Sequence, residues 1–282
     1  MPTFDTPTPI SATISVVSGD VRISAGDRNV TTVSVEPTDT SNDEDRKAAE
    51  LTRVEYADGA LLVKAPKLRS WLPRSTGGSV DVRIELPAGS NVNGATALAD
   101  FTCDGPLGEC RVKSGLGDIR LDQADTVNLK TGIGDITVDR ATGHAEVNAG
   151  SGDVRVRELG STGVIKNSNR DTWVGVANGD LRVSAANGSI AIDVARAGVV
   201  AKSSNGDVRL GEAVRSAVVL ETKLGDVEVG IPEGTSAWLD VRAAAGKVHN
   251  ALDAADSPAP SAETVEVRAR TSGGDVVVRR PR

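Results

Sequence analysis

A five-residue phrase returns about every eighteen residues between Leu98 and Asn250: Gly-Asp, then an apolar, a variable and a second apolar residue. Self-similarity at a short, fixed period means that one unit cannot bury its own apolar face and must stack on its neighbours. The spacing leaves no room for a helix between units. Clear copies of the phrase begin at Gly117, Gly134, Gly152, Gly206 and Gly225, and weaker copies at Ala99, Arg170, Gly188 and Gly246.

Within each unit, apolar residues alternate with polar ones, as they do in a half-buried strand. One apolar pair follows the glycine, such as Ile119/Leu121, and a second precedes it, such as Val127/Leu129 or Leu239/Val241. Glycine allows the positive φ of a tight corner, and Asp can bond nearby backbone amides. The pattern predicts an all-β parallel solenoid with about 18 residues per coil. A narrow lumen of Val, Ile, Leu and Ala also fits an aromatic content of 2%.

We expect one continuous domain with two parts. Residues 1–95 supply N-terminal strands, an acidic loop and a hairpin that form the first coils or a cap. Residues 96–282 form the regular solenoid, and Val265–Arg268 with Gly274–Val278 supply the two strands of a final, closing coil.

The N-terminal part carries an early copy of the phrase at Gly19, which places the alternating strands of Ile10–Val35 in the first turns of the solenoid. Thr38–Asp45 is polar and acidic and is expected to be an exposed loop. One or two helical turns follow at Arg46–Leu51. The Asp58-Gly59 turn predicts a hairpin between Val54 and Lys64.

Charge and hydropathy limit the kinds of partner that this chain is expected to bind. The net charge of −7 argues against nucleic acid and acidic membrane surfaces. No apolar run is long enough for a membrane span. The start, Met1 to Asp5, lacks the basic and apolar segments of a secretory signal, so we expect a cytoplasmic protein, with the cell surface as the alternative. Cys103 and Cys110 fall on inward columns of one coil; reduced thiols are favoured, and a disulfide bridge stays open.

A column of acidic residues is the most prominent candidate for chemistry. Stacked carboxylates repel, and calcium β-rolls relieve this with a Gly-Gly-x-Gly-x-Asp repeat; here the double glycine is missing, so structural turn capping is favoured over calcium. No metal or cofactor is expected, because His144 and His249 have no ligand cluster nearby. Gly150-Ser151-Gly152 is not followed by a helix and is not a phosphate loop. The acidic residues are Asp100, Asp118, Asp135, Asp153, Asp171, Asp207 and Asp226.

The column three residues after the glycine contains Arg155, Trp173 and Arg209 and should face outward. A tryptophan among arginines on a flat sheet is a candidate contact patch for a protein partner or a glycan. Alternatively, Trp173 lies over the aliphatic stems of its neighbours. No catalytic residue can be named.

The Gly-Asp phrase, the corner Leu86-Pro87-Ala88-Gly89 and the segment Lys166 to Trp173 resemble the bacterial putative-adhesin β-strand-repeat family, a domain family of unknown function. The similarity covers nearly the whole chain. It implies a right-handed, single-stranded parallel β-helix and no catalytic residues. Relatives usually carry Gly where Arg170 stands, so this corner is expected to be strained or reshaped.

Three functions are compatible with these observations. The first is a non-catalytic β-solenoid that acts as a scaffold or protein-interaction module, with an unknown protein or a second copy as partner, and self-assembly as one form. The second is a surface adhesin or glycan-binding protein. The third is a carbohydrate-active β-helix enzyme.

Overall fold

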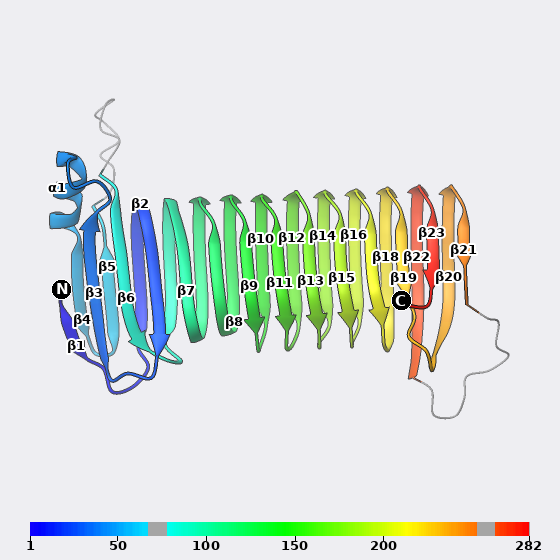
Figure 1. The fold of residues 1–282 in the computed structure, drawn as a ribbon, viewed down its shortest axis with the longest axis horizontal. Coiled ribbons are helices and arrows are strands. Elements are labelled where there is room, and N and C mark those ends of the chain that lie inside the picture. Colours follow the sequence, from blue (N-terminus) through cyan, green and yellow to red (C-terminus); the bar gives the residue numbers. More distant parts are fainter. Residues whose placement is uncertain (67–77, 253–262, 282) are drawn as a thin grey trace. The chain divides into compact units, whose positions relative to one another are not determined.

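The structure is a computed structural model that describes residues 1–66, 78–252 and 263–281. It divides into two compact units, unit 1 (Met1–Asp139) and unit 2 (Arg140–Arg282). The regular structure of the described residues is β-strand apart from one helix (Figure 1). The prediction of an all-β chain with parallel pairing is therefore confirmed. No helix in the described ranges is long and apolar enough to cross a membrane.

In unit 1, a strand from near the N-terminus lies between parallel neighbours on both sides. β2 pairs in parallel with β5 and β6 on one side and with β7 on the other (Figure 1). Val21 and Phe101 lie in one buried column, as do Ile23 and Cys103. The elements are β1 (Thr3–Asp5), β2 (Ser11–Gly26), β3 (Val30–Pro37), α1 (Asp43–Leu51), β4 (Arg53–Ala57), β5 (Ala60–Lys64), β6 (Val80–Pro87), β7 (Asn91–Leu116) and β8 (Ile119–Ile133); β9 (Ile136–Ala141) follows them.

The outer strands of unit 1 are antiparallel. β3 pairs with β1 and β6, and β4 pairs with β5. The placement of all strands of Ile10–Val35 in solenoid turns is thus right for β2 and wrong for β3. The phrase at Gly26-Asp27 continues with Arg28 instead of an apolar residue, so no further coil is formed.

The predicted hairpin is confirmed, with φ of 50° at Asp58 and 75° at Gly59 in its turn. The predicted helical turns are also confirmed. The helix begins earlier than expected, at Asp43, because the side chain of Asn42 accepts the Glu44 N–H and caps it. The last three residues of the expected loop therefore belong to α1.

Unit 2 stacks short strands in parallel (Figure 1). One buried column runs through Val154, Thr172, Ile190 and Val208. The strands are β10 (Ala145–Ser151), β11 (Val154–Leu159), β12 (Gly163–Asn169), β13 (Thr172–Ala177), β14 (Leu181–Asn187), β15 (Ile190–Ala195), β16 (Val199–Asn205), β17 (Val208–Ala213), β18 (Ser216–Leu224), β19 (Val227–Gly230), β20 (Thr235–Ala245), β21 (Val248–Asn250), β22 (Glu263–Gly273) and β23 (Val276–Arg279).

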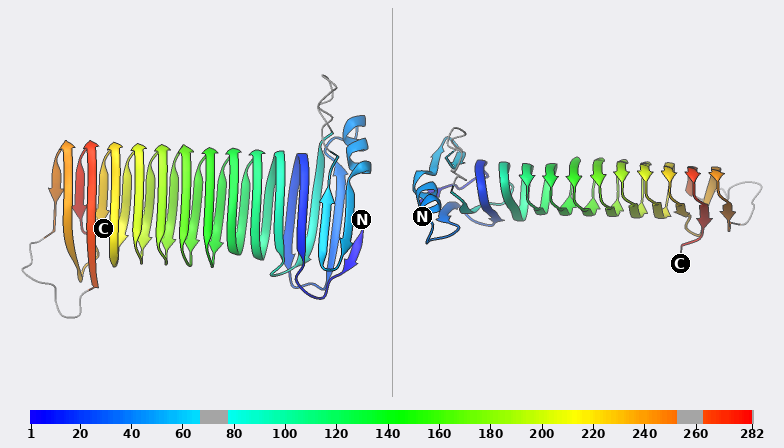
Figure 2. Two further views of the ribbon diagram at one scale, coloured as in Figure 1. Left: turned by 180° about the vertical axis from the view of Figure 1, so that it is seen from behind. Right: turned by 90° about the horizontal axis from the view of Figure 1, so that it is seen from above.

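The last coil along the chain is not the last coil of the stack. β22 pairs with β18 on one side and with β20 on the other, and β23 likewise lies between β19 and β21. Figures 1 and 2 show the red coil inserted between the yellow and orange ones. The prediction of two strands near the C-terminus is right, but their position as the closing coil is wrong.

The insertion leaves β20 and β21 as the terminal coil of unit 2. Leu239 and Val241 were expected to be inward and buried like the other pairs; they are half-buried, because β20 has a neighbour on one side only among the described residues. In register with them, Val267 and Ala269 are fully buried.

Candidate functional site

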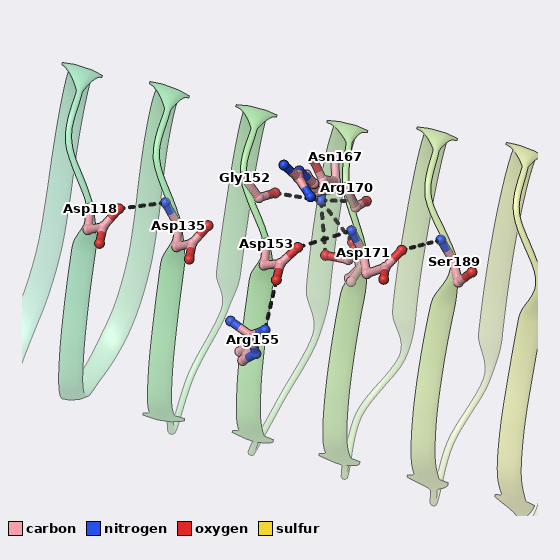
Figure 3. Close-up of polar contacts among 10 residues, drawn as sticks. Asp118, Asp135, Gly152, Asp153, Arg155, Asn167, Arg170, Asp171 and Ser189 are labelled. Carbon is pink, nitrogen blue, oxygen red and sulfur yellow. Dashed lines mark hydrogen bonds and ion pairs between the residues drawn. The ribbon is translucent and has the colours of Figure 1, made fainter.

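The aspartates of the repeat form hydrogen-bonded ladders between coils (Figure 3). In unit 1, the Oδ1 of Asp100 accepts the N–H of Asp118 at 2.8 Å, and the Oδ1 of Asp118 accepts the N–H of Asp135 at 2.9 Å. In unit 2, Asp171 likewise accepts the N–H of Ser189 at 2.8 Å. The rungs Asp153 to Asp171, Asp207 to Asp226, Asp226 to Asp275 and Asp275 to Lys247 repeat this bond.

These carboxylates therefore have a structural task that explains their recurrence without an ion. The expectation of a local turn cap is corrected in one respect, because the acceptor reaches the neighbouring coil. Among the residues that the structure describes, no three His, Cys, Asp or Glu side chains are placed to hold a metal ion.

A second set of hydrogen bonds lies inside several of the corners and was missed from the sequence. Buried Ser, Thr or Asn side chains, three residues before the corner glycine, donate to the carbonyl of the preceding corner. Thr222 donates to the Gly206 carbonyl at 2.9 Å, and Thr131 to that of Gly117 at 3.1 Å. Their signal in the sequence is a polar residue on an inward column, which is costly unless it is bonded.

The corner at Arg170 departs from the glycine rule, as the resemblance implied. Arg170 has a φ of 107°, a region that L-residues rarely adopt. The buried Asn167 donates its Nδ2 to the carbonyls of Gly152, Arg170 and Asp171 at 3.1–3.2 Å (Figure 3). Three carbonyls around the strained corner thus share one amide donor.

The predicted outward column lies in register. Arg155 pairs with Trp173, and Ala191 separates Trp173 from Arg209. The polar groups of all three residues contact neighbours in the chain. The Nη2 of Arg155 lies 2.7 Å from Asp153, the Nε of Arg209 lies 2.6 Å from Glu228, and the Nε1 of Trp173 donates to Asp193 at 3.2 Å.

The indole of Trp173 also lies close to Gly175: a Cβ on that glycine would be 3.3 Å from the ring. Trp173 is half-buried. The indole ring of Trp173 therefore packs over the backbone at Gly175, whereas the sequence suggested that it would lie over the aliphatic stems of its neighbours.

The position just before the corner glycine differs between the units and was also missed. In unit 1 it carries large, exposed apolar residues, which we call the apolar ridge: Leu98 (51% exposed), Leu116 (45%) and Ile133 (55%). In unit 2 the same position carries asparagines in three successive coils and then Leu224, which is 61% exposed. Asn187 donates to Asn169 at 3.0 Å, and Asn205 donates to Asn187 at 2.8 Å.

A charge cluster that the sequence did not indicate joins β20 of the terminal coil to the neighbouring β22. Asp240 lies 2.8 Å from Arg270, 3.3 Å from Arg242 and 3.4 Å from Arg268. The hydrogen bond from Arg270 holds the pKa of Asp240 below its ordinary value. Trp238, beside this cluster on β20, is 72% exposed.

The histidines do not share a site in unit 2. His144 bonds Thr162 through its Nδ1 at 2.7 Å, whereas the Nε2 of His249 lies 4.0 Å from Asp275. In unit 1 the buried Cys103 and Cys110 are free thiols. A hydrogen bond with Cys110 and burial raise the pKa of Cys103, so this thiol is a poor nucleophile.

Stacked parallel coils with Gly-Asp corners define a repetitive all-β protein. The chain belongs to the family described as Toastrack DUF4097, whose profile matches residues 11–279. The resemblance to a domain family of unknown function is thereby confirmed. No match was found among curated proteins.

Several solved structures are similar to the chain. A putative lipid binding protein from Parabacteroides distasonis has 10% identity and a TM-score of 0.48, over 99% of this chain and 95% of that one. A putative adhesin from the same species has 14% identity and a TM-score of 0.47, over 98% and 95%. A putative adhesin from Parabacteroides merdae has 11% identity and a TM-score of 0.44, over 98% and 94%.

Proposed function

We propose that the protein is a non-catalytic scaffold that binds another protein through its outer surface, on a right-handed β-solenoid of about 18 residues per coil. The paired polar groups of the repeat support this. The corner aspartates accept backbone N–H groups, and Arg155 and Arg209 face carboxylates. These groups build a stiff framework, and none of them is arranged as an acid, base or nucleophile.

The observation that carries the proposal is the apolar ridge of unit 1. Leu98, Leu116 and Ile133 occupy the same corner position and are about half exposed. An apolar side chain is not required at that position, since Asn169, Asn187 and Asn205 fill it in three coils of unit 2, although Leu224 is again apolar there. Apolar residues gathered on an otherwise polar surface are typical of interaction sites. The partner should therefore offer an apolar surface of its own.

The chain supplies its own control for the test. The triple variant Leu98→Asn, Leu116→Asn, Ile133→Asn gives the ridge the residue that unit 2 has, so its melting temperature should stay near that of the wild type. A photo-crosslinking residue in place of Asn93, exposed elsewhere on unit 1, marks partners in the native cell. We expect a discrete crosslinked protein with the wild type and its loss with the triple variant. Equal capture by both would contradict the proposal.

The contact patch Arg155, Trp173 and Arg209 supports a second candidate, glycan binding. The indole of Trp173 sits beside Arg155 and bonds Asp193, so an aromatic face and a carboxylate lie together on an outward sheet. Such a pair suits a sugar ring. Fluorescence titration with a glycan library tests it in a Trp71→Phe, Trp238→Phe background, with Trp173→Phe and Trp173→Ala as comparisons. No response from any glycan would remove this candidate.

A cytoplasmic location is part of the main proposal. The buried, adjacent thiols Cys103 and Cys110 are suited to a reducing compartment. Fractionation of the native cell tests the location, and recovery at the cell surface would favour the adhesin alternative. Mass measurement after alkylation of the unfolded protein tests the thiols: a reduced pair takes up two labels, and a bridged pair takes up none.

A further inference from the structure

Among the residues that the structure describes, the terminal coil of unit 2 has a strand partner on one side only. β20 pairs with β22 and β21 with β23, and within the described ranges neither has a second neighbour. Leu239 and Val241 are consequently half-buried, and Trp238 is 72% exposed. β20 is eleven residues long. An uncovered edge strand of this length can pair with another chain.

The corner of this coil argues against another parallel coil on top of it. In the coils below, an Asp carboxylate accepts the N–H of the next coil, as Asp226 does for Asp275 and Asp275 does for Lys247. The terminal coil carries Lys247 at this position. An ammonium group therefore stands where the acceptor would be needed, and head-to-tail stacking would leave the next amide unpaired.

In the antiparallel direction, by contrast, the sequence of β20 is complementary to itself. With Val241 as the centre, Asp240 stands opposite Arg242 of a second copy, and Arg242 stands opposite its Asp240. Trp238 then lies opposite Ala244, so the large side chain meets a small one. Opposite charges directly across two strands stabilise pairing, and like charges destabilise it.

Asp240 and the arginines near it on β20 and β22 are the charged groups that would meet a second copy. Asp240 serves three guanidinium groups, of Arg242, Arg268 and Arg270. The buried Nε of Arg270 has no acceptor among the described residues. Two-fold symmetry would bring each Asp240 opposite Arg242 of the other copy, so each carboxylate would bridge guanidinium groups of both chains.

We infer that the protein forms a two-fold dimer in which β20 pairs antiparallel with β20 of a second copy, centred on Val241. The open edge of β20 is then paired in both copies, and the contact is closed by its two-fold symmetry, so association stops at two copies. The dimer uses a surface different from the apolar ridge. Failure of one proposal therefore leaves the other intact.

Charge reversal tests the register. Light scattering of the full chain over a wide concentration range should show a dimer for the wild type. Arg242→Asp and Asp240→Arg each place like charges opposite one another and should weaken dimerisation at least tenfold. An equimolar mixture of the two variants restores opposite charges across the axis and should form a heterodimer. Arg182→Asp, an exposed change on an interior coil of unit 2, is the control and should remain dimeric.

Cysteine crosslinking supplies a second measurement that does not depend on charge. Residues on the two-fold axis face themselves, at a Cα separation of about 5 Å that permits a disulfide. Val241→Cys should therefore form a linked dimer on mild oxidation, and Ala237→Cys should not. A wild type that stays monomeric at every concentration, growth beyond two copies, or a dimer that ignores both Arg242→Asp and the cysteine positions would overturn the inference.

Discussion

The first coils of unit 1 and the last coils of unit 2 share one device and differ in how they end. Each inserts a strand from near a terminus between two strands that lie close together in the sequence: β2 between β6 and β7, and β22 between β18 and β20. In unit 1 the outer edge is then covered by antiparallel strands and α1. In unit 2 the described residues leave the outer edge of β20 uncovered.

The difference shows what a stack of coils needs at its ends. The cover of unit 1 uses dedicated contacts: Asp45 is buried and accepts the N–H groups of Ser79 and Asp39 at 2.8 and 3.1 Å. The open end of unit 2 instead carries Lys247 and an arginine-rich outward face. The covered end should unfold only together with the rest of unit 1. The open end of unit 2 should unfold locally, at a lower cost in free energy.

The largest expected effect compares two corner glycines. A Cβ on Gly19 would lie 1.9 Å from the Val80 carbonyl oxygen, and one on Gly246 would lie 1.9 Å from that of Gly274. Gly19→Ala should lower the free energy of unfolding by about 3 kcal/mol, because β2 is held from both sides. Gly246→Ala should cost only about 1 kcal/mol, since the terminal coil can shift away. Urea unfolding measures both, and equal losses would break the comparison.

The second prediction concerns the cover itself. Asp45→Ala leaves two N–H groups of unit 1 without their acceptor and should cost about 2 kcal/mol of unfolding free energy. Asp275→Ala is the matched change at the open end. It removes the exposed acceptor of the Lys247 N–H and a carboxylate that lies 4.0 Å from His249, and should cost about 0.5 kcal/mol. Thermal melts of both variants decide, and a larger loss for Asp275→Ala would contradict the assignment of α1 and its loop as a cover.

The third prediction concerns an interior corner held from both sides. Arg170→Gly should raise the free energy of unfolding by about 1 kcal/mol, because glycine adopts the φ of 107° at little cost. Gly188→Ala, at the next corner, is the opposite change and should destabilise, since its Cβ would lie 2.0 Å from the Arg170 carbonyl oxygen. If Arg170→Gly brings no gain, then the amide of Asn167 already relieves the corner.

The parallel coils could be predicted because the same residue pattern recurs in many coils. The Gly-Asp phrase and the apolar pairs repeat in every coil, so buried residues such as Ile119 and Val154 follow from period and alternation alone. The order of the coils at each end was not predictable. A copy of the phrase at Gly19 or Gly274 fixes the shape of a coil, but any coil can pair with any other, and the phrase does not say which.

At the candidate site, too, the sequence could predict only part of what the structure shows. Arg155 and Trp173 were expected to be neighbours, and the register places them so. Their ion-pair and hydrogen-bond partners could not be predicted, because Asp153 and Asp193 reach them through side-chain rotamers that a periodic pattern does not specify. The exposure of Trp238 could not be predicted either, since it depends on which coil ends the stack.

The smallest expected effect concerns one aspartate at each end and the interaction through which its carboxylate stabilises the fold. Asp39 at the covered end and Asp240 at the open end both have a lowered pKa: the hydroxyl and N–H of Ser41 bond the first, and Arg270 bonds the second. A lowered folded-state pKa contributes stability above the unfolded pKa of about 4, and this is lost as the pH falls through the folded value. Asp39→Asn and Asp240→Asn should each flatten the acid limb of the melting-temperature profile.

Salt distinguishes the two variants. The partner of Asp240 is a guanidinium group at an exposed site, so high ionic strength screens the interaction and should bring the melting temperatures of Asp240→Asn and the wild type together. The partners of Asp39 are a neutral hydroxyl and a backbone amide, and its difference from Asp39→Asn should persist in salt. Melting profiles between pH 2 and 7 at low and high salt measure this. A salt-sensitive Asp39 or a salt-insensitive Asp240 would show that charge does not distinguish the open end from the covered one.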